Sequence, residues 1–423
     1  MIYLVISFVA LFLLTVPIAV SIGLSSLTMI VQMGMPAALV GQRLFASLDS
    51  FPLLAIPFFI LAGAIMEQGG ISTRMINFAN TCVGDTKGGL AIVTIIASMF
   101  FAAVSGSGAA TAAAIGSIMI PAMVKKSYDV RFASATTATA AQIGVIIPPS
   151  IPMVLYCVGT NNSISKLFIA GVVPGIFIGL SLILYAVYVS KKEGYAGDRR
   201  YSLREKLEAF RSAVWALLMP VIILGGIYCG IFTPTEAAAV ASAYAVVVGL
   251  FIYRDINFKD LLSIFYKASI TIAVVMIILS TAGLFAYVLT MNRIPQLVAD
   301  FFLSLGGNKY VFLLLINILL FFCGMFFDGG PVMIILAPIL APVAVSLGVD
   351  PIHFGIIMVC NSALGQITPP FGVNLFVVSQ VAKIKMENMI SNLIPYILIV
   401  VADVMAITYI PVISMALPKF LGM

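Results

Sequence analysis

Two short stretches, GVIIPPS (Gly144–Ser150) and GQITPPFG (Gly365–Gly372), decide the fold of this 423-residue chain. Each lies within a long apolar segment and contains a Pro-Pro pair, which cannot continue the hydrogen-bond ladder of an α-helix. The glycines beside each pair let the backbone approach a neighbouring segment closely. We therefore predict one broken helix in each half of the chain, at 131–158 and 353–382.

The two stretches belong to an internal repeat in which the second copy follows the first by 221 residues. The matched positions are Gly108 and Gly329, Pro121 and Pro342, Asp129 and Asp350, Gly144 and Gly365, and Pro148-Pro149 and Pro369-Pro370. Glycine and proline mark unusual backbone, so their recurrence at one offset indicates two copies of the same structural unit.

The composition identifies a membrane protein, because 62% of the residues are hydrophobic and only 9% are charged. A soluble domain is about one quarter charged. Nucleic-acid-binding proteins, secreted disulfide scaffolds and ordinary cytosolic enzymes are thereby excluded. The apolar runs do not alternate with polar residues, which favours membrane-spanning helices over a β-barrel. With a single histidine and no paired acids or HExxH-like motif, the chain offers no catalytic set, and we expect neither enzyme activity nor an organic cofactor.

The distribution of basic residues predicts the orientation. Five loops carry 17 of the 22 Lys and Arg residues and are assigned to the cytoplasm: Glu67–Gly88, Val124–Arg131, Lys191–Arg211, Arg254–Lys267 and Lys383–Asn388. The loops on both sides of 89–124 are assigned to the cytoplasm, so this segment must enter and leave the membrane on that side. We therefore predict a re-entrant hairpin with its tip at Ser105–Gly108. By the same argument, 310–347 is a hairpin entering from outside, with its tip at Phe327–Gly330. The sequence thus predicts an all-α polytopic protein with an inverted-topology repeat, a plan typical of secondary transporters.

The repeat also predicts the division of the chain. We expect scaffold spans and a cytoplasmic arm at 1–88, a transport-domain half at 89–190, a connector at 191–212, scaffold spans and a periplasmic arm at 213–308, and a second transport-domain half at 309–423 that ends with a span at 389–413. The N-terminal run Ile2–Val31 is interrupted at Thr15–Pro17. Two short spans would place Met1 outside, and one bent helix would place it inside; the repeat favours two spans. The run lacks a charged start, so we expect no cleavable signal.

Each hairpin tip, with the break beside it, is a predicted sodium site, because hydroxyl, carbonyl and carboxylate oxygens suit a hard cation. The residues are Ser105, Ser107, Gly108, Gly144 and Ile147 in the first half, and Asp328, Gly329, Gly365 and Thr368 in the second. The alternatives without ion binding are small-residue helix packing for the first tip and a structural helix cap for Asp328. Glu236 fits a capping box, and Asp403 is expected to pair with a polar neighbour.

An anionic substrate is expected to bind where new half-helices begin after the prolines, since helix N-termini attract anions. The four core motifs contain no Lys or Arg, so half-helix ends, hydroxyls and amides must hold the substrate. The predicted substrate residues are Pro148, Pro149, Ser150, Asn361, Pro369, Pro370 and Asn374.

Several motifs resemble the large membrane subunit (DctM type) of the tripartite ATP-independent periplasmic (TRAP) transporters. They are IPFFILAGAIMEQGGIS (Ile56–Ser72), VSGSGAATAAAIGSIMIPAM (Val104–Met123), IGVIIPPSIPMVLY (Ile143–Tyr156), LFIAGVVPG (Leu167–Gly175), YCGIFTPTEAAAVA (Tyr228–Ala241) and GQITPPFGVNLFV (Gly365–Val377). The resemblance covers essentially the whole chain.

The resemblance implies sodium-coupled import of an organic acid, without ATP, across the bacterial inner membrane. A periplasmic binding protein would deliver the substrate, and a small four-span membrane subunit would be a separate chain. The large subunit is similar to elevator-type ion transporters, whose two sodium sites carry over to Ser105, Ser107 and Gly144, and to Asp328, Gly365 and Thr368. C4-dicarboxylates and sialic acids such as N-acetylneuraminate are the implied substrate classes, and the motifs do not choose between them. The alternative is a stand-alone sodium/dicarboxylate symporter of similar fold.

Overall fold

The computed structural model describes residues 2–304 and 307–423. Within these residues the chain is helical and contains no strand. Nine of the described helices are long and apolar enough to cross a bilayer. The predicted all-helical polytopic fold is therefore confirmed.

The first half contains ten α-helices and two 3₁₀ turns among its described residues. They are α1 (Ile2–Leu13), α2 (Ile18–Gln32), α3 (Ala38–Ala46), η1 (Phe51–Leu54), α4 (Ala55–Gln68), α5 (Ile71–Val83), α6 (Gly89–Ser105), α7 (Gly108–Lys125), α8 (Val130–Ala141), η2 (Gln142–Val145), α9 (Ile151–Thr160) and α10 (Ile164–Lys192). The described residues of the second half form α11 (Leu203–Tyr228), α12 (Pro234–Val247), the π turn η3 (Val248–Ile252), α13 (Phe258–Met291), α14 (Ile294–Ser304), α15 (Lys309–Phe326), α16 (Gly329–Ser346), α17 (Pro351–Gly365), α18 (Val373–Ala382), α19 (Met386–Tyr409) and α20 (Val412–Phe420).

The repeat is visible helix by helix. Helices α7 and α16 begin at the matched glycines, Gly108 and Gly329, and each has 18 residues. Helices α8 and α17 each begin after a matched aspartate, Asp129 or Asp350, whose side chain accepts backbone N–H groups as the N-cap. The same N-capping residue therefore starts the corresponding helix in both halves.

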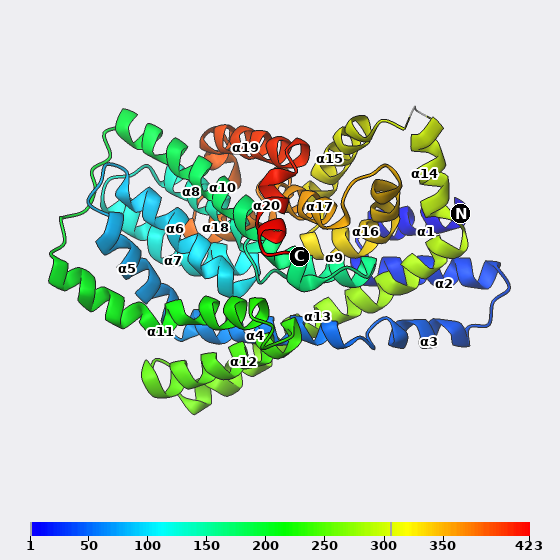
Figure 1. Ribbon diagram of the computed structural model, residues 1–423, viewed down its shortest axis with the longest axis horizontal. Helices are drawn as coiled ribbons and strands as arrows, with labels where there is room; N and C mark the ends of the chain where they lie inside the picture. Colours follow the sequence, from blue (N-terminus) through cyan, green and yellow to red (C-terminus); the bar gives the residue numbers. More distant parts are fainter. Residues whose placement is uncertain (1, 305–306) are drawn as a thin grey trace.

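Both predicted hairpins are present. Helices α6 and α7 pack against each other and turn at Gly106 and Ser107, where Gly106 has a positive φ of 61° that favours glycine. Helices α15 and α16 turn at Phe327 and Asp328, and Asp328 is the N-cap of α16. The first hairpin and the second lie on opposite sides of the molecular centre (Figure 1).

Both predicted breaks are also present. The first follows η2, and α9 starts only at Ile151; the second separates α17 from α18, which starts at Val373. From 132 to 141 and from 352 to 365, every residue of α8 and α17 is buried. A helix that is apolar or small on all sides is covered on all sides, so each of these two helices lies at the centre of its half of the repeat.

The N-terminal run consists of two short helices, as the repeat favoured. Helices α1 and α2 lie side by side and antiparallel, with the hydroxyls of Ser7 and Thr28 3.4 Å apart. The chain reverses at Thr15, which has a φ of 58°. Met1 lies outside the described residues.

Several helix ends differ from the ends of the hydrophobic runs in the sequence. The apolar run Leu44–Met66 is interrupted between α3 and α4, where Ser50 is extended and η1 begins at Phe51, with Pro52 in its first turn. Its counterpart α13 is continuous and begins at a capping box of Asn257 and Asp260, ten residues before the apolar run Ala268–Met291.

Helix α11 likewise begins within the predicted connector, at a capping box of Ser202 and Glu205, so only 193–202 remains as a loop. The last span ends at Tyr409, four residues before the predicted end, and α20 follows it. Local capping side chains set these helix ends, whereas the prediction followed hydrophobicity alone.

Side-chain contacts join four of the five basic loops, as their assignment to one face requires. Arg74 pairs with Asp255 and Lys126 with Asp198, whose Nζ–Oδ1 distance is 2.9 Å. Asp198 also accepts hydrogen bonds from Asn80 (3.1 Å) and Tyr201 (2.6 Å). We call Asn80, Lys126, Asp198 and Tyr201 the connector clasp, because they tie the loop 193–202 to the arm helix α5 and to the end of the first hairpin.

Candidate functional site

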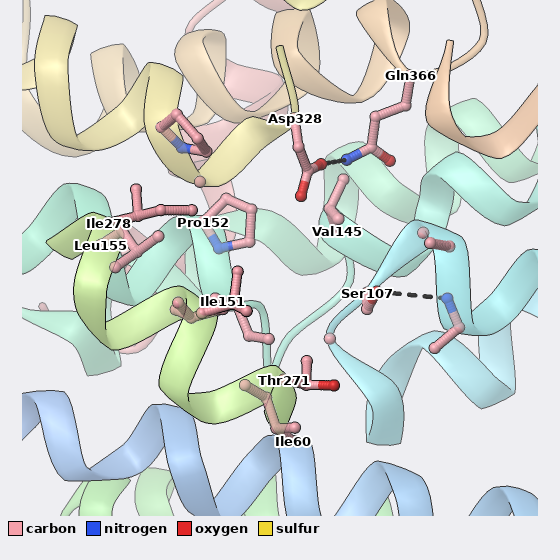
Figure 2. Close-up of a pocket in the computed structure, with 18 of the residues that line it drawn as sticks. Ile60, Ser107, Val145, Ile151, Pro152, Leu155, Thr271, Ile278, Asp328 and Gln366 are labelled. Carbon is pink, nitrogen blue, oxygen red and sulfur yellow. Dashed lines mark hydrogen bonds between the residues drawn. The ribbon is translucent and has the colours of Figure 1, made fainter. Parts of the chain in front are cut away.

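A cavity of about 750 Å³ lies where the two hairpin tips meet. Its polar wall is formed by residues 105–110 of the first tip, by Asp328 of the second and by Gln366 of the second break. Its apolar wall comes from α4 and α13, including Ile60 and Ile278 (Figure 2). The cavity thus lies between the two repeated hairpins on one side and the predicted scaffold on the other.

The first tip brings three oxygen atoms together. The Oγ of Ser105 lies 3.3 Å from the carbonyl oxygen of Ser107 and 3.1 Å from Oγ1 of Thr111, which donates to that carbonyl at 2.8 Å. Oxygens at this spacing form a triangular face that fits a cation coordinated at about 2.3–2.6 Å. The hydroxyl of Ser107 also caps α7 by accepting the N–H of Ala110 at 3.4 Å.

Gly144 contacts this triangle directly. A Cβ at Gly144 would lie 2.6 Å from Oγ1 of Thr111 and 2.7 Å from the carbonyl oxygen of Ser107. Only glycine lets the break approach the tip so closely. Ile147 is directed elsewhere, with its side chain against Gly175 of α10. The structure therefore gathers Ser105, Ser107 and Gly144, as predicted, around Thr111.

At the second tip, Asp328 faces the cavity. Its Oδ1 accepts the N–H of Gly329 and Nε2 of Gln366, both at 2.8 Å (Figure 2). Thr368 lies in the second break and directs its hydroxyl back to the carbonyl of Leu364 at the end of α17, at 2.8 Å. The second cluster is therefore built on Asp328 and Gln366.

Gly365 holds the second hairpin against the second break. A Cβ at Gly365 would lie 2.6 Å from the carbonyl oxygen of Gly324 on α15, and closer still to other backbone atoms of Gly324. The backbones of α15 and α17 therefore touch four residues before Asp328. This contact sets the position of the Asp328 carboxylate relative to the break.

Each tip also contacts the broken helix of the other half. A Cβ at Gly108 would lie 2.9 Å from Oδ1 of Asn374 and closer to Oε1 of Gln366, and a Cβ at Gly329 would lie 3.4 Å from Pro152. The two halves are therefore interlocked at the cavity, and a ligand there contacts both.

The predicted substrate residues divide into three groups. Asn374 is completely buried beside the first tip, and neither its Oδ1 nor its Nδ2 has a hydrogen-bond partner. Ser150 uses its hydroxyl within the break, donating to the carbonyl of Val145 at 2.6 Å. Asn361 lies away from the cavity and donates to Asn317 on α15 at 2.5 Å.

The Pro-Pro pairs have different surroundings. Pro148 and Pro149 are buried, whereas Pro369 and Pro370 are at least partly accessible, and Phe371 beside them is 63% exposed. Both pairs contain a cis peptide bond. The structure brings Pro149 next to Gly106, so the first pair supports the first tip.

Thr111 and Gln366 are site residues that were not predicted. Thr111 lies one helical turn after the tip, in the run AATAAA that also reads as simple helix packing. Gln366 lies within the GQITPPFG motif, but the helix break was predicted there from the glycines and prolines alone. The available signal was a polar side chain close to a predicted hairpin tip for Thr111 and within a predicted break for Gln366.

The charge of the cavity is one-sided. The described residues that line it include the acids Glu67 and Asp328 and no Lys, Arg or His. Within the described part of the chain, no group of three or more His, Cys, Asp or Glu side chains is arranged to bind a metal ion. A transition-metal centre therefore has no basis among these residues, whereas hydroxyl, carbonyl and single-carboxylate oxygens favour an alkali cation.

Comparison with known proteins identifies the family. The family model described as "Tripartite ATP-independent periplasmic transporter, DctM component" matches residues 5–413. The chain belongs to this family. The family resemblance of the sequence motifs is therefore confirmed, and the chain is a multi-pass membrane protein of the TRAP large-permease type.

Two relatives share 46% identity with this DctM chain. One is the isethionate TRAP transporter permease protein DctMQ of Oleidesulfovibrio alaskensis, matched over 96% of this chain and 64% of the relative. The chain therefore spans under two thirds of that relative's length. The other is the C4-dicarboxylate TRAP transporter large permease protein DctM of Pseudomonas aeruginosa, matched over 90% of this chain and 89% of the relative.

The fold is also similar to a solved structure. The YdaH transporter of Alcanivorax borkumensis, described as having an unusual topology, aligns over 90% of this chain and 87% of its own with a TM-score of 0.62. The sequence identity is 15%, so this similarity concerns the fold alone.

Proposed function

We propose that this DctM chain is the large membrane subunit of a TRAP system that imports an organic acid with sodium, by an elevator movement. The observation that carries the proposal is the cavity between the two hairpin tips, whose described lining contains two acids and no basic side chain. An organic anion entering such a cavity needs a counter-charge that the lining does not supply. Sodium ions bound beside it provide that charge.

The position of Asp328 supports cation coupling. Asp328 faces a cavity enclosed by apolar helices, where a carboxylate is costly unless it is paired. Its partners here, the Gly329 N–H and the Gln366 amide, carry no formal charge. A cation at Asp328 would remove this cost, and an anion would then bind next to the cation rather than next to a bare carboxylate. The oxygen triangle at Ser105, Ser107 and Thr111 offers a second cation position of neutral ligands.

The arm helices support an elevator movement. Helix α5 packs against both α11 and α6, and α14 packs against both α13 and α16. Each arm thus joins a helix of the scaffold (α2, α4, α11, α12 and α13) to a hairpin. In the proposed movement, the block with both hairpins and both breaks slides past α4 and α13 and carries the cavity with it.

The names of the relatives support an acid as the substrate. The 46% identical relatives are named for isethionate and for C4-dicarboxylates, so overall identity does not select between a sulfonate and a dicarboxylate. We propose an organic acid of the C4-dicarboxylate or sialic acid (N-acetylneuraminate) class, delivered by a periplasmic binding protein. We further propose a separate small four-span subunit as partner and the bacterial inner membrane as location.

Proteoliposomes test this proposal. The chain would be reconstituted with and without its small subunit and binding protein, under an inward sodium gradient, with labelled succinate, isethionate or N-acetylneuraminate. We expect uptake that requires sodium and both partners, with one label preferred. Uptake by the chain alone would instead establish the stand-alone symporter. Uptake that is unchanged when potassium replaces sodium would refute sodium coupling.

A further inference from the structure

Gln366 is the side chain that connects the two hairpin tips. It follows α17 directly, is only 3% exposed and lies on the cavity wall. On one side it contacts Asp328 of the second tip, and on the other it lies against Gly108 of the first tip, beside Asn374. Figure 2 shows the amide of Gln366 directed at Asp328.

The two ends of this amide are chemically distinct. An ionised carboxylate only accepts hydrogen bonds, so the NH₂ group of Gln366 must face Asp328, and it does so at 2.8 Å. The carbonyl oxygen Oε1 consequently faces Gly108, where it has no hydrogen-bond partner. The completely buried amide of Asn374, beside the same glycine, has no partner either. Buried polar groups are nearly always paired. Two unpaired amides, Gln366 on the cavity wall and Asn374 next to Gly108 of that wall, therefore point to a ligand.

We propose that Gln366 is a cation-dependent amide switch that prepares the Gly108–Asn374 side of the cavity for an acid group of the substrate. The inference rests on the proposed sodium-coupled function. Without a cation, Gln366 presents its carbonyl oxygen to this subsite and repels an anion. With a cation at Asp328, the amide turns over and presents its NH₂ group.

Simple electrostatics drives the turn. A cation at Asp328 repels the N–H dipole of Gln366 and attracts its carbonyl oxygen, which is a suitable ligand for a hard cation. The terminal torsion of glutamine is broad and roughly two-fold, so exchanging the two ends needs no movement of the backbone. After the exchange, Nε2 of Gln366, Nδ2 of Asn374 and the N-terminus of α7 at Gly108 all offer donors to one acid group.

The size of the effect follows from the hydrogen bond. A bond to a charged group changes an affinity by roughly 10- to 100-fold. We therefore expect saturating sodium to raise the substrate affinity of the wild-type protein by about that factor through Gln366. Because linkage is reciprocal, the substrate should raise the sodium affinity by the same factor.

The test measures succinate and isethionate affinity of the full chain in lipid nanodiscs over a series of NaCl concentrations, with choline chloride keeping the ionic strength constant. Gln366→Leu should weaken the affinity at saturating sodium by about 10-fold or more and flatten its sodium dependence. Sodium should still raise the melting temperature of this variant without substrate, because Asp328 remains. Gln380→Leu, an exposed glutamine on α18, is the matched control and should behave as wild type.

Gln366→Glu is the second variant, and it nearly preserves the shape of the side chain. It replaces the donor by a second carboxylate, so it should bind sodium and lose the anion. An unchanged sodium dependence of substrate binding in Gln366→Leu, or sodium-promoted anion binding in Gln366→Glu, would overturn the switch. If the wild-type protein itself binds both anions without regard to sodium, the proposed function fails, and the switch fails with it. If sodium raises the substrate affinity of the wild-type protein and of both Gln366 variants equally, the switch is refuted but the proposed function stands.

Discussion

Replacing Gly365 by alanine tests whether the backbone contact between α15 and α17 organises the second tip. The added Cβ would lie 2.6 Å from the carbonyl oxygen of Gly324, whereas ordinary contacts begin at 3.4 Å. The obstacle is backbone, so no side chain can turn away, and α15 must retreat by about 1 Å. Overpacking of this kind costs typically 1–3 kcal/mol.

The retreat should also disturb the site. Asp328 follows Gly324 by four residues, and its bond to Gln366 is 2.8 Å long. A shift of about 1 Å takes this distance beyond the usual hydrogen-bond range of about 3.2 Å. We therefore expect Gly365→Ala to raise the sodium concentration for half-maximal uptake and to lower the apparent melting temperature.

The assay compares two alanine variants of the purified protein, heated in NaCl or choline chloride and then analysed by size-exclusion chromatography. Gly225→Ala adds the same methyl group to α11, where no atom lies within 4 Å of the new Cβ. Alanine favours a helix over glycine by up to about 1 kcal/mol, so this control should melt at or above the wild-type temperature. Equal melting of the two variants would refute a tight contact at Gly365.

Three further predictions concern the tips and the connector. Asp328→Asn keeps an acceptor for the Gly329 N–H but removes the charge, so sodium-dependent uptake should fall more than protein abundance in the membrane; equal losses would indicate a folding role. Ser107→Ala keeps the carbonyl oxygen of the triangle but removes the hydroxyl that caps α7 beside it, so it should raise the sodium concentration for half-maximal uptake; an unchanged sodium curve would show that this hydroxyl does not support the cation site. A hydrogen bond from Tyr201 holds the pKa of Asp198 well below its usual range. Burial acts in the opposite direction, and hydrogen bonds from Lys126 and Asn80 add to the lowering. The stability that this carboxylate contributes is therefore complete above about pH 4 and is lost only below it. Hydrogen exchange of the loop 193–202 should stay slow from pH 7 to about pH 5 and accelerate in Asp198→Asn, whereas equally fast exchange in both proteins would refute the clasp.

Much of the fold follows from local features that the sequence displays. Proline pairs end helices wherever they occur, and glycines permit tight turns and close contacts, so both breaks and both hairpin tips were predictable. The recurrence of these residues after 221 positions predicted the paired arrangement of helices α5–α10 and α14–α19. The hydrophobic runs indicated the spans but not their ends, which capping side chains such as Ser202 and Asn257 determine.

The partners of individual side chains were decided by tertiary structure. Asn361 and Asn374 both looked like substrate ligands, yet Asn361 is held by Asn317 from another helix, and Asn374 is left unpaired beside Gly108. Gln366 became a central residue only because α17, both hairpins and α18 meet there. Such contacts join segments that are far apart in the sequence, as in the hydrogen bond between Thr136 and Tyr396, which are 260 residues apart. They depend on how the helices pack and not on the local pattern of the chain, because a helix with one sequence can present its polar groups to many different neighbours.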